Sequence, residues 1–374
     1  MKKCFLLALG IMLSVASRLS CAAPTAAHVA VPVRHVFVIV LENEPFDVTF
    51  GAQSLAPYLA HELTRQGALL TQYYGTGHYS LDNYISLISG QAPNPATQED
   101  CSQYVEFKAT TGKLDANGQL AGSGCVYPSQ VKTVADQLRA ARFSWKGYME
   151  GMGSDPSRET AQCGHAAIGS RDHSNGESLK DRYADKHDPF VYFHSIIDDP
   201  AYCGAHVVPL NDMAKDLENV ATTPNYAFIT PDLCHDGHDA PCRNGEPGGL
   251  VSADAFLRTW VPRITASPAF RKDGVLIITF DEGTDGTACC GEQPLPRGSQ
   301  PGQYGPGGGR IGAVVLSPFV KPGTISDHPY NHYSTLRSVE QWFSLPYLSY
   351  AQPASVPVFG NDVFNQRPGA STSR

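Results

Sequence analysis

The sequence predicts an α/β fold, with a central, mostly parallel β-sheet flanked by helices. The first observation is that residues 31–41 form a largely apolar, β-branched run, typical of a parallel strand buried on both faces. The second is that such runs alternate with segments of helical periodicity. The third is size, because 374 residues, 42% of them hydrophobic, suffice for a large core. With no composition break or internal repeat, we expect a single domain over residues 28–366.

Each expected strand is a short run rich in branched and aromatic residues. The run at 274–280 is apolar apart from one threonine and is interpreted, like 31–41, as a fully buried strand. The run at 68–74 leads into a loop that carries several glycines. Strands are expected, in order, at 31–41, 68–74, 143–149, 226–230, 274–280 and 311–318.

The expected helices are segments whose apolar residues recur every three or four positions. Leu81, Tyr84, Ile85 and Ile88 fall on one face of a helix that ends near Gly90. The same periodicity marks five further segments. Helices are therefore expected at 54–66, 81–89, 133–142, 210–220, 252–267 and 333–343.

Residues 1–23 have the features of a secretory signal peptide. Two early lysines are followed by an apolar stretch at 5–16 and a small-residue cleavage site at 21–23. Cys21 could alternatively carry a lipid, but Arg18 fits that pattern poorly. Because the apolar stretch is too short for a comfortable span and no later segment approaches one, we expect no stable membrane insertion. The expected product is a soluble exported protein, periplasmic or secreted.

Eight cysteines follow the signal peptide, and an even number indicates disulfides in an exported chain. Proximity makes Cys101–Cys125 and Cys234–Cys242 plausible pairs without fixing the connectivity. Two long stretches, 91–127 and 151–188, are loop-like and are expected to be insertions that build walls around a pocket. Residues 367–374 are expected to form a disordered tail.

The charge of the chain argues against nucleic acid as a partner. The formal net charge is −8, and the sequence has no long basic run. Binding to nucleic acid depends on lysine and arginine side chains that neutralise phosphates. Nucleic acid is therefore not an expected partner, and the sequence does not indicate an oligomeric state.

The loop at 75–79 leads into Ser80, at the expected start of a helix. The helix dipole and free backbone N–H groups favour an anion at that position. Asn83 lies one turn further on the same side, so a hydroxyl and an amide would face one anion-binding spot, as a nucleophile and its oxyanion partner do. The alternative is that Ser80 is an ordinary helix N-cap, since serine is common there.

Polar residues follow several expected strands and precede the last expected helix. Strand ends of one sheet converge on one edge, so we expect these residues to lie close together with Ser80. Carboxylates and imidazoles that converge with a serine point to a metal site that activates a hydroxyl. Taken singly, each group could instead be a helix cap or a turn. The groups are Glu42-Asn43, Asp236 with His238, Asp281-Glu282, and Tyr330-Asn331-His332.

These motifs resemble those of a known family. Residues 38–51, with Glu42-Asn43 followed by Phe46-Asp47, are similar to the opening motif of the phosphoesterase family of bacterial acid phosphatases and phospholipase C enzymes, part of the alkaline phosphatase superfamily. Residues 80–90 resemble the nucleophile segment of the superfamily's nucleotide pyrophosphatases. The resemblance implies an alkaline-phosphatase-like sandwich with disulfide-bonded loop insertions. It continues, in the superfamily's order, at 230–239, 280–283, 307–312 and 330–334.

The resemblance also implies a site for a divalent metal ion. Oxygen-rich ligands suit calcium, magnesium or manganese better than zinc alone, although all four metals stay open. Because Glu282 occupies a position where the superfamily commonly has histidine, one ion or two ions are both expected possibilities. The expected ligands are Glu42, Asn43, Ser80, Asp236, Asp281 and Glu282.

The remaining candidate residues are expected to act on the phosphate. Ser80 would attack phosphorus, and Asn83 would stabilise the non-bridging oxygens. His238 and His332, with Asp236, would either hold a second ion or contact the phosphate and protonate the leaving group. His78 could assist from the loop as a substrate-binding residue.

The sequence therefore predicts an exported, metal-dependent phosphoesterase, a phosphomonoesterase of the acid-phosphatase type that acts through a phosphoserine. The first alternative is a phosphodiesterase or phospholipase C that acts on lipid headgroups. The second alternative is an inactive exported binding protein on the same scaffold, because a fold does not by itself imply an activity.

Overall fold

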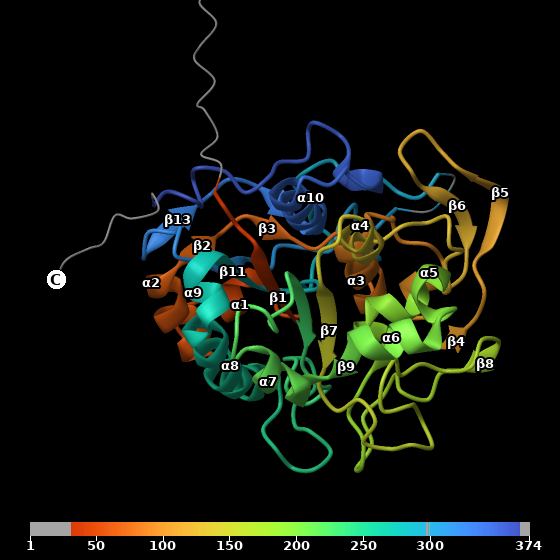
Figure 1. Cartoon of the computed structure of the whole chain (residues 1–374), viewed down its shortest axis with the longest axis horizontal. Coiled ribbons are helices and arrows are strands. Elements are labelled where there is room, and N and C mark those ends of the chain that lie inside the picture. The colour runs from red at the N-terminus through yellow and green to blue at the C-terminus, as the bar shows by residue number, and fades with distance from the viewer. Residues whose placement is uncertain (1–30, 297, 299, 367–374) are drawn as a thin grey trace, which may run out of the picture.

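The computed structural model describes residues 31–296, 298 and 300–366, and its centre is an eight-stranded sheet (Figure 1). The expected signal peptide (1–23) and tail (367–374) lie outside the described residues. The sheet has the order β13-β2-β12-β11-β1-β10-β7-β9. Its strands are β1 (His35–Leu41), β2 (Ala68–Leu70), β7 (Trp145–Met149), β9 (Val207–Pro209), β10 (Tyr226–Thr230), β11 (Gly274–Phe280), β12 (Ala313–Leu316) and β13 (Thr324–Ser326).

The sheet is mostly parallel, as predicted. β1 pairs in parallel with both β10 and β11, and only β12 runs antiparallel to its neighbours β11 and β2 among the described pairings of this sheet. Every residue of β1 and β11 is buried, as their apolar runs predict. The predicted first strand was too long at its start. Pro32 has no N–H for a ladder, and the N–H of Arg34 bonds to the Asp273 carbonyl instead.

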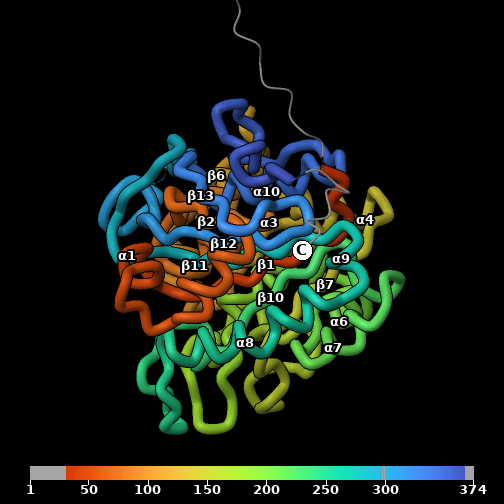
Figure 2. The backbone as a smooth tube through the Cα atoms, turned by 90° about the vertical axis from the view of Figure 1, so that its left-hand side faces the viewer, coloured from red at the N-terminus to blue at the C-terminus, as the bar shows by residue number. Residues whose placement is uncertain are grey.

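Helices cover both faces of the sheet, which gives the predicted sandwich. Figure 2 shows α3 (Ser80–Ser89) and α10 (His332–Phe343) on one side and α8 (Gly249–Ala266) on the other. α3 ends as predicted, because Gly90 adopts a left-handed φ of 68°. The other α-helices are α1 (Phe46–Thr49), α2 (Thr64–Gln66), α4 (Val134–Ala140), α5 (His194–Ile197), α6 (Pro200–His206), α7 (Met213–Asp216) and α9 (Pro268–Asp273).

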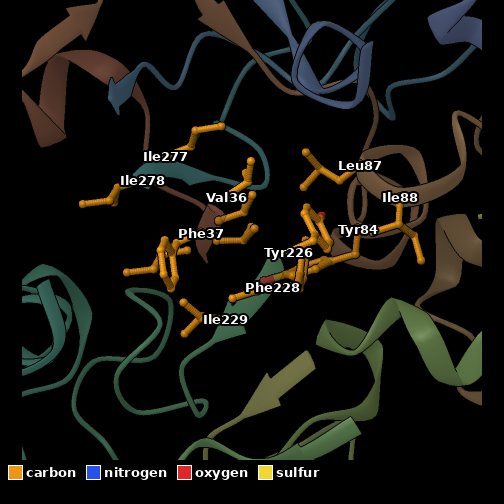
Figure 3. Close-up of a cluster of buried hydrophobic side chains, with 14 of the residues drawn as sticks. Val36, Phe37, Tyr84, Leu87, Ile88, Tyr226, Phe228, Ile229, Ile277 and Ile278 are labelled. Carbon is orange, nitrogen blue, oxygen red and sulfur yellow. The ribbon is translucent and has the colours of Figure 1, made fainter. Parts of the chain in front are cut away.

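The main hydrophobic core lies on both faces of the sheet, against α3 on one side and against α8 and α9 on the other. Phe228 of β10 packs against Tyr84 of α3 on one face of the sheet, whereas Phe37 of β1 packs against Phe270 of α9 on the other (Figure 3 shows Phe37, Phe228, Ile277, Tyr84 and Ile88). All six are buried. Each such side chain contributes about 1.5–3 kcal/mol relative to exposure, so the core fixes α3 firmly against the strand ends.

Three predicted elements differ from the structure. The predicted strand at 68–74 is split, because β2 is followed by a turn and β3 (Tyr73–Tyr74) pairs with β14 (Tyr330–Asn331) outside the main sheet. The helix predicted at 54–66 begins only at Tyr58, as the π-helix η1 (Tyr58–Leu63), and continues as α2. The helix predicted at 210–220 is short, consisting of η5 (Leu210–Asp212) and α7. The hydroxyls of Thr222 and Thr223 bond to the Asp216 carbonyl, which a longer helix would use.

The two long insertions are only partly irregular. The stretch 91–127 contains a hairpin of β5 (Lys108–Leu114) and β6 (Leu120–Ser123), and β5 is exposed throughout, so it lacks the apolar alternation that reveals a strand. The stretch 151–188 contains β8 (Ser170–Arg171), which pairs with β4 (Gln103–Tyr104). The 3₁₀ helices are η2 (Thr97–Glu99), η3 (Asp185–His187), η4 (Pro189–Tyr192), η5 and η6 (Ser349–Ala351).

Four disulfides join the eight cysteines that follow the expected signal peptide, which confirms the prediction from their even number. Both plausible pairs are present, and Cys289–Cys290 joins neighbours in sequence. The fourth bond attaches the 151–188 insertion to α6, through Cys163–Cys203. Within the described residues, the helices are all too short or too polar to cross a membrane.

Candidate active site

The candidate site lies where three adjacent strands end. Glu42 follows β1, and Asp281 follows β11; Asp236 lies in the loop after β10. Backbone hydrogen bonds continue past the strands, since the Glu42 N–H donates to the Asp236 carbonyl and the Asp281 N–H donates to the Leu41 carbonyl, both at 2.8 Å. The carboxyl ends of parallel strands therefore bring three acidic side chains to one edge, as predicted.

Ser80 faces this edge from the first position of α3. Its Oγ donates a hydrogen bond to Glu42 Oε2 at 2.7 Å, and the Tyr84 hydroxyl donates to Glu42 Oε1 at 2.6 Å. The N-cap of α3 is Tyr79, whose side chain makes no capping hydrogen bond. The Ser80 side chain therefore does not cap α3, and its hydroxyl bonds to Glu42 instead.

Asn43 and Glu282 extend the cluster. Asp281 Oδ1 accepts hydrogen bonds from the backbone N–H groups of Asn43, at 2.9 Å, and Glu282, at 2.6 Å. The Asn43 amide donates to Glu282 Oε1 at 2.8 Å. Asn43 has a left-handed φ of 45°, which asparagine tolerates better than most residues. This turn directs the Asn43 side chain toward Glu282 and the Asn43 N–H toward Asp281.

The four carboxyl groups are buried, and burial disfavours their charged forms. Burial raises the pKa of Asp281 to about 6 and that of Asp236 to about 7. Burial, followed by the charges of Asp281 and Asp236, raises the pKa of Glu42 well above its ordinary value. Burial and the charge of Asp281 do the same for the pKa of Glu282.

The residues present fit a divalent cation. Asp236 Oδ2 and Asp281 Oδ2 are both buried, and neither has a hydrogen-bond partner among the described residues. Buried carboxylate oxygens without partners are costly unless a cation or a proton neutralises them. Oxygen donors of this kind are the preferred ligands of calcium and magnesium.

His187 joins the cluster, although the sequence analysis did not single it out. Its Nε2 lies 3.3 Å from Glu42 Oε1, and its Nδ1 lies 3.7 Å from Asp236 Oδ2. The ring is buried and stacks on Tyr84 at 5.2 Å. Burial lowers the pKa of His187 well below its ordinary value. His187 comes from η3, inside a stretch without periodicity or a strand end, so the only available signal was the polar run at 185–188.

Lys186 supplies positive charge beside the carboxylates. Its Nζ lies 3.0 Å from Asp100 Oδ2. Burial acts to lower its pKa, but the charges of Asp100 and Glu42 outweigh this and raise the pKa above the ordinary value. Asp100 also accepts the N–H of Leu81 in the first turn of α3.

Asn83 is directed into the protein rather than toward an open space. Its Oδ1 accepts the N–H groups of Thr76 at 2.8 Å and Gly77 at 3.0 Å, and its Nδ2 donates to the carbonyls of Gly77 and Tyr79. Nδ2 also lies 3.4 Å from Glu282 Oε2. The structure thus places Asn83 as the residue that shapes the loop before Ser80.

The three candidate histidines have different surroundings. His332 lies behind the cluster, with Nε2 donating to the Asp281 carbonyl at 2.6 Å and Nδ1 3.2 Å from the Tyr73 hydroxyl. Burial lowers the pKa of His332 to about 4, so the ring is neutral. His238 is half exposed and pairs with Asp239, while its backbone N–H donates to Asp236. Nε2 of the buried His78 donates to the Gly283 carbonyl at 3.1 Å.

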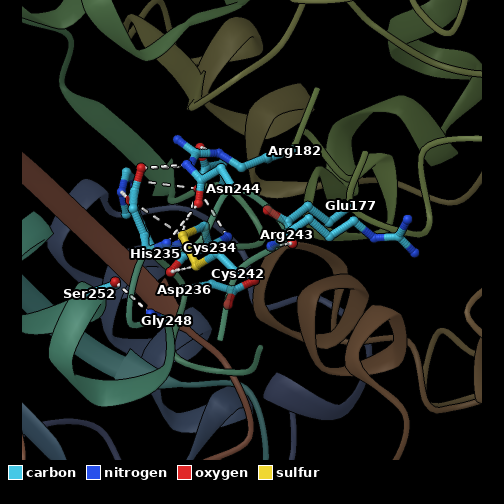
Figure 4. The surroundings of a disulfide bond; sticks show 12 residues. Glu177, Arg182, Cys234, His235, Asp236, Cys242, Arg243, Asn244, Gly248 and Ser252 are labelled. Carbon is cyan, nitrogen blue, oxygen red and sulfur yellow. Dashed lines mark hydrogen bonds and ion pairs between the residues drawn. A yellow bond between two sulfur atoms is a disulfide. The ribbon is translucent and has the colours of Figure 1, made fainter. Parts of the chain in front are cut away.

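A disulfide closes the loop that presents Asp236. Figure 4 shows Cys234–Cys242 beside His235 and Asp236. In the same loop, His235 Nδ1 lies 3.0 Å from Glu150 Oε2. The loop is therefore held by a covalent bond and an ion pair, and Asp236 is fixed at the end of β10.

Hydrogen bonds link Ser80 to Glu42, and they link Asn43 to Asp281 and Glu282. Asp236 adjoins Glu42 through the backbone, and His238 follows Asp236, whereas His332 contacts the Asp281 carbonyl. This arrangement defines a protein with a carboxylate-lined site around a serine, at the edge of a mostly parallel sheet. The chain belongs to the Phosphoesterase family, whose model matches residues 55–346. The predicted family is thus confirmed.

Relatives at the sequence level include acid phosphatases of fungi. The probable acid phosphatase of Kluyveromyces lactis is 26% identical over 318 residues, which are 84% of this chain and 59% of that protein. The acid phosphatase of Aspergillus fumigatus is 25% identical over 76% of this chain and 50% of that protein. The chain thus spans about half to three fifths of these fungal relatives. A phosphatidylinositol-3-phosphatase of Mycobacterium tuberculosis is 24% identical over 86% of this chain and 80% of that protein.

The chain is also similar to solved structures at low sequence identity. A Bacteroides thetaiotaomicron protein described in connection with the metabolism of multiple glycosaminoglycans gives a TM-score of 0.51 at 12% identity, over 90% of this chain and 83% of that chain. A Vibrio parahaemolyticus protein in the alkaline phosphatase superfamily gives 0.47 at 14% identity, over 84% of this chain and 67% of that chain.

Proposed function

We propose that this chain is an exported phosphomonoesterase of the acid-phosphatase type with Ser80 as its nucleophile and a small phosphoester as its substrate. The observation that carries the proposal is the 2.7 Å hydrogen bond from Ser80 to Glu42, beside two buried carboxylates with unpartnered oxygens. Membership of the Phosphoesterase family and the fungal relatives support this reaction class. The four disulfides support export, because such bonds persist in oxidising compartments.

A divalent cation is part of the proposal. When bound, it would supply positive charge that lowers the pKa of the serine hydroxyl and neutralises charge on the phosphate. The residues that would hold it are Glu42, Asn43, Ser80, Asp236, Asp281 and Glu282, whose geometry is given above.

The proposed reaction has two displacements. Glu42 takes the proton of Ser80 through their hydrogen bond as Oγ attacks phosphorus. The bond from Oγ to phosphorus forms, and the bond from phosphorus to the leaving alcohol breaks. His238, half exposed and next to Asp236, gives the alcohol its proton. Water then attacks phosphorus and gives a proton to His238, the bond from phosphorus to Oγ breaks, and Ser80 recovers its proton from Glu42.

Other residues position these groups. His187 contacts Glu42 and lies against Tyr84, which limits the orientations of the Glu42 carboxylate. His332 holds the backbone of Asp281, and Asn83 holds the loop before Ser80. The positive end of the α3 dipole favours the phosphate at Ser80. Within this proposal, His332 and Asn83 act by positioning and not by proton transfer or direct phosphate contact.

The test compares phosphate monoesters with diesters. Purified protein is assayed with 4-nitrophenyl phosphate and bis(4-nitrophenyl) phosphate, before and after treatment with a chelator. We expect higher kcat/KM on the monoester, loss of turnover on chelation, and recovery when a divalent metal is added. A preference for the diester would favour the phosphodiesterase alternative. No turnover of any phosphoester by metal-replete protein would favour the inactive binding protein.

A further inference from the structure

A cavity of about 320 Å³ lies beside the loop that presents Ser80. His78 and Tyr79, the two residues before Ser80, form one part of its lining. Gln98, Glu99 and Gln303 form other parts. Because His78 Nε2 also lies 4.0 Å from Glu282 Oε2, the cavity adjoins the acidic cluster of the candidate site.

The cavity is held open by specific contacts between three segments. The Gln98 amide donates to the Pro301 carbonyl at 2.9 Å, which attaches the loop after β11 to η2. The Gln303 amide donates to the Tyr79 hydroxyl at 2.9 Å, which attaches the same loop to the nucleophile loop. These contacts give the cavity a defined wall.

The lining combines an aromatic ring, side-chain amides and a carboxylate. Tyr79 is 40% exposed, so its ring is available to a ligand. Glu99 is exposed at the cavity, and Asp285 lies close enough to His78 to act on it electrostatically. The Glu99 carboxylate places negative charge at the cavity.

We propose that this cavity is the leaving-group subsite of the enzyme and that Glu99 makes it select phosphate esters of uncharged or cationic alcohols. This inference rests on the proposed function. A leaving group with a carboxylate or a second phosphate would meet the Glu99 carboxylate, and like charges brought together disfavour binding. An uncharged alcohol can instead lie against Tyr79 and bond to the amides, and a cation gains from both the ring and the carboxylate.

The test uses three small monoesters that differ in the charge of the leaving alcohol, namely choline phosphate, glycerol 1-phosphate and 3-phosphoglycerate. For the metal-replete protein we expect kcat/KM to be lowest for 3-phosphoglycerate. Glu99→Gln should reduce the ratio of kcat/KM for glycerol 1-phosphate to kcat/KM for 3-phosphoglycerate by roughly three- to tenfold. This is the effect of about 1 kcal/mol between partly solvated charges. Glu99→Lys should reduce this ratio further and lower kcat/KM for choline phosphate relative to the other two substrates.

Glu218→Lys is the matched control, because Glu218 is exposed on a different part of the chain and the substitution changes the net charge equally. This control should leave the relative kcat/KM values of the three substrates unchanged. Turnover of all three substrates with ratios that do not respond to Glu99 would overturn the subsite and leave the proposed function intact. Absence of turnover on every monoester would overturn both.

Discussion

Ser80 Oγ lies 2.7 Å from Glu42 Oε2, although one residue begins a helix and the other follows the central strand. The other oxygen of Glu42 accepts a hydrogen bond from Tyr84, one helical turn beyond Ser80. Two side chains of α3 therefore hold one carboxylate at both oxygens. This arrangement couples the serine rigidly to the acidic cluster, because α3 is itself fixed by the core.

Replacement of the serine tests its role most directly. Ser80→Ala should lower kcat on 4-nitrophenyl phosphate by about 10³-fold or more, because removal of a nucleophile eliminates the first displacement. Far-UV circular dichroism and Tm should show a retained fold. Ser89→Ala is the matched control, since Ser89 is also buried on α3 but its hydroxyl bonds to the Ile85 carbonyl and the Gln91 N–H, outside the acidic cluster. Equal activity of the Ser80 and Ser89 variants would exclude Ser80 as the nucleophile.

Replacement of Asp281, whose Oδ2 has no hydrogen-bond partner among the described residues, tests the cation site. Asp281→Asn should lower the metal content of purified protein, measured by mass spectrometry, and weaken the dependence of activity on added metal, because an amide binds a hard cation less strongly than a carboxylate does. Asp212→Asn, at an exposed position, should change neither property. A variant that retains the wild-type metal content would argue against Asp281 as a ligand.

The disulfide that closes the Asp236 loop should matter more for activity than for stability. By the loop-entropy relation, loss of Cys234–Cys242, with a separation of 8 residues, should cost about 2.5 kcal/mol, and loss of Cys163–Cys203, with a separation of 40, about 4 kcal/mol. Double serine variants of each pair are compared by urea unfolding and by kcat/KM. We expect loss of Cys234–Cys242 to reduce kcat/KM more, and loss of Cys163–Cys203 to reduce the free energy of unfolding more. The reverse order in kcat/KM would mean that the disulfide does not position Asp236.

Glu340 gives a prediction for pH dependence. Burial raises its pKa from 4.5 to about 9, and its Oε1 accepts the Leu348 N–H at 2.8 Å. Between pH 4.5 and 9 the folded protein keeps this proton and the unfolded chain releases it, so the group lowers the free energy of unfolding as pH rises through that window. Glu340→Gln removes this titration and keeps an acceptor oxygen. The free energy of unfolding gained by this substitution should therefore be larger at pH 8 than at pH 4.5, by roughly 1–3 kcal/mol.

Thermal unfolding at the two pH values measures this effect. Glu218→Gln, at an exposed position, should show no comparable difference between pH 4.5 and pH 8. A Glu340→Gln variant whose gain is the same at both pH values would show that the carboxyl does not titrate in this window.

The sequence was sufficient for the central strands and the acidic cluster, for a physical reason. β10 and β11 match their predicted bounds because buried parallel strands are continuous apolar runs. Glu42 and Asp281 follow such runs directly, so the edge of the sheet alone brings them together. α3 and its terminal Gly90 were also determined locally, by periodicity and by the left-handed conformation that glycine adopts easily.

Only the tertiary structure decided how the surrounding residues are used. Asn83 has the spacing of a phosphate ligand, yet the loop at 76–79 folds over its amide and takes its hydrogen bonds. His332 follows the expected pattern but lies behind Asp281, and His187 reaches Glu42 from an insertion without periodicity. The direction of a side chain depends on packing against residues distant in sequence. The sequence therefore determined the central strands, α3 and the positions of Glu42 and Asp281, whereas packing decided the positions of Asn83, His332 and His187.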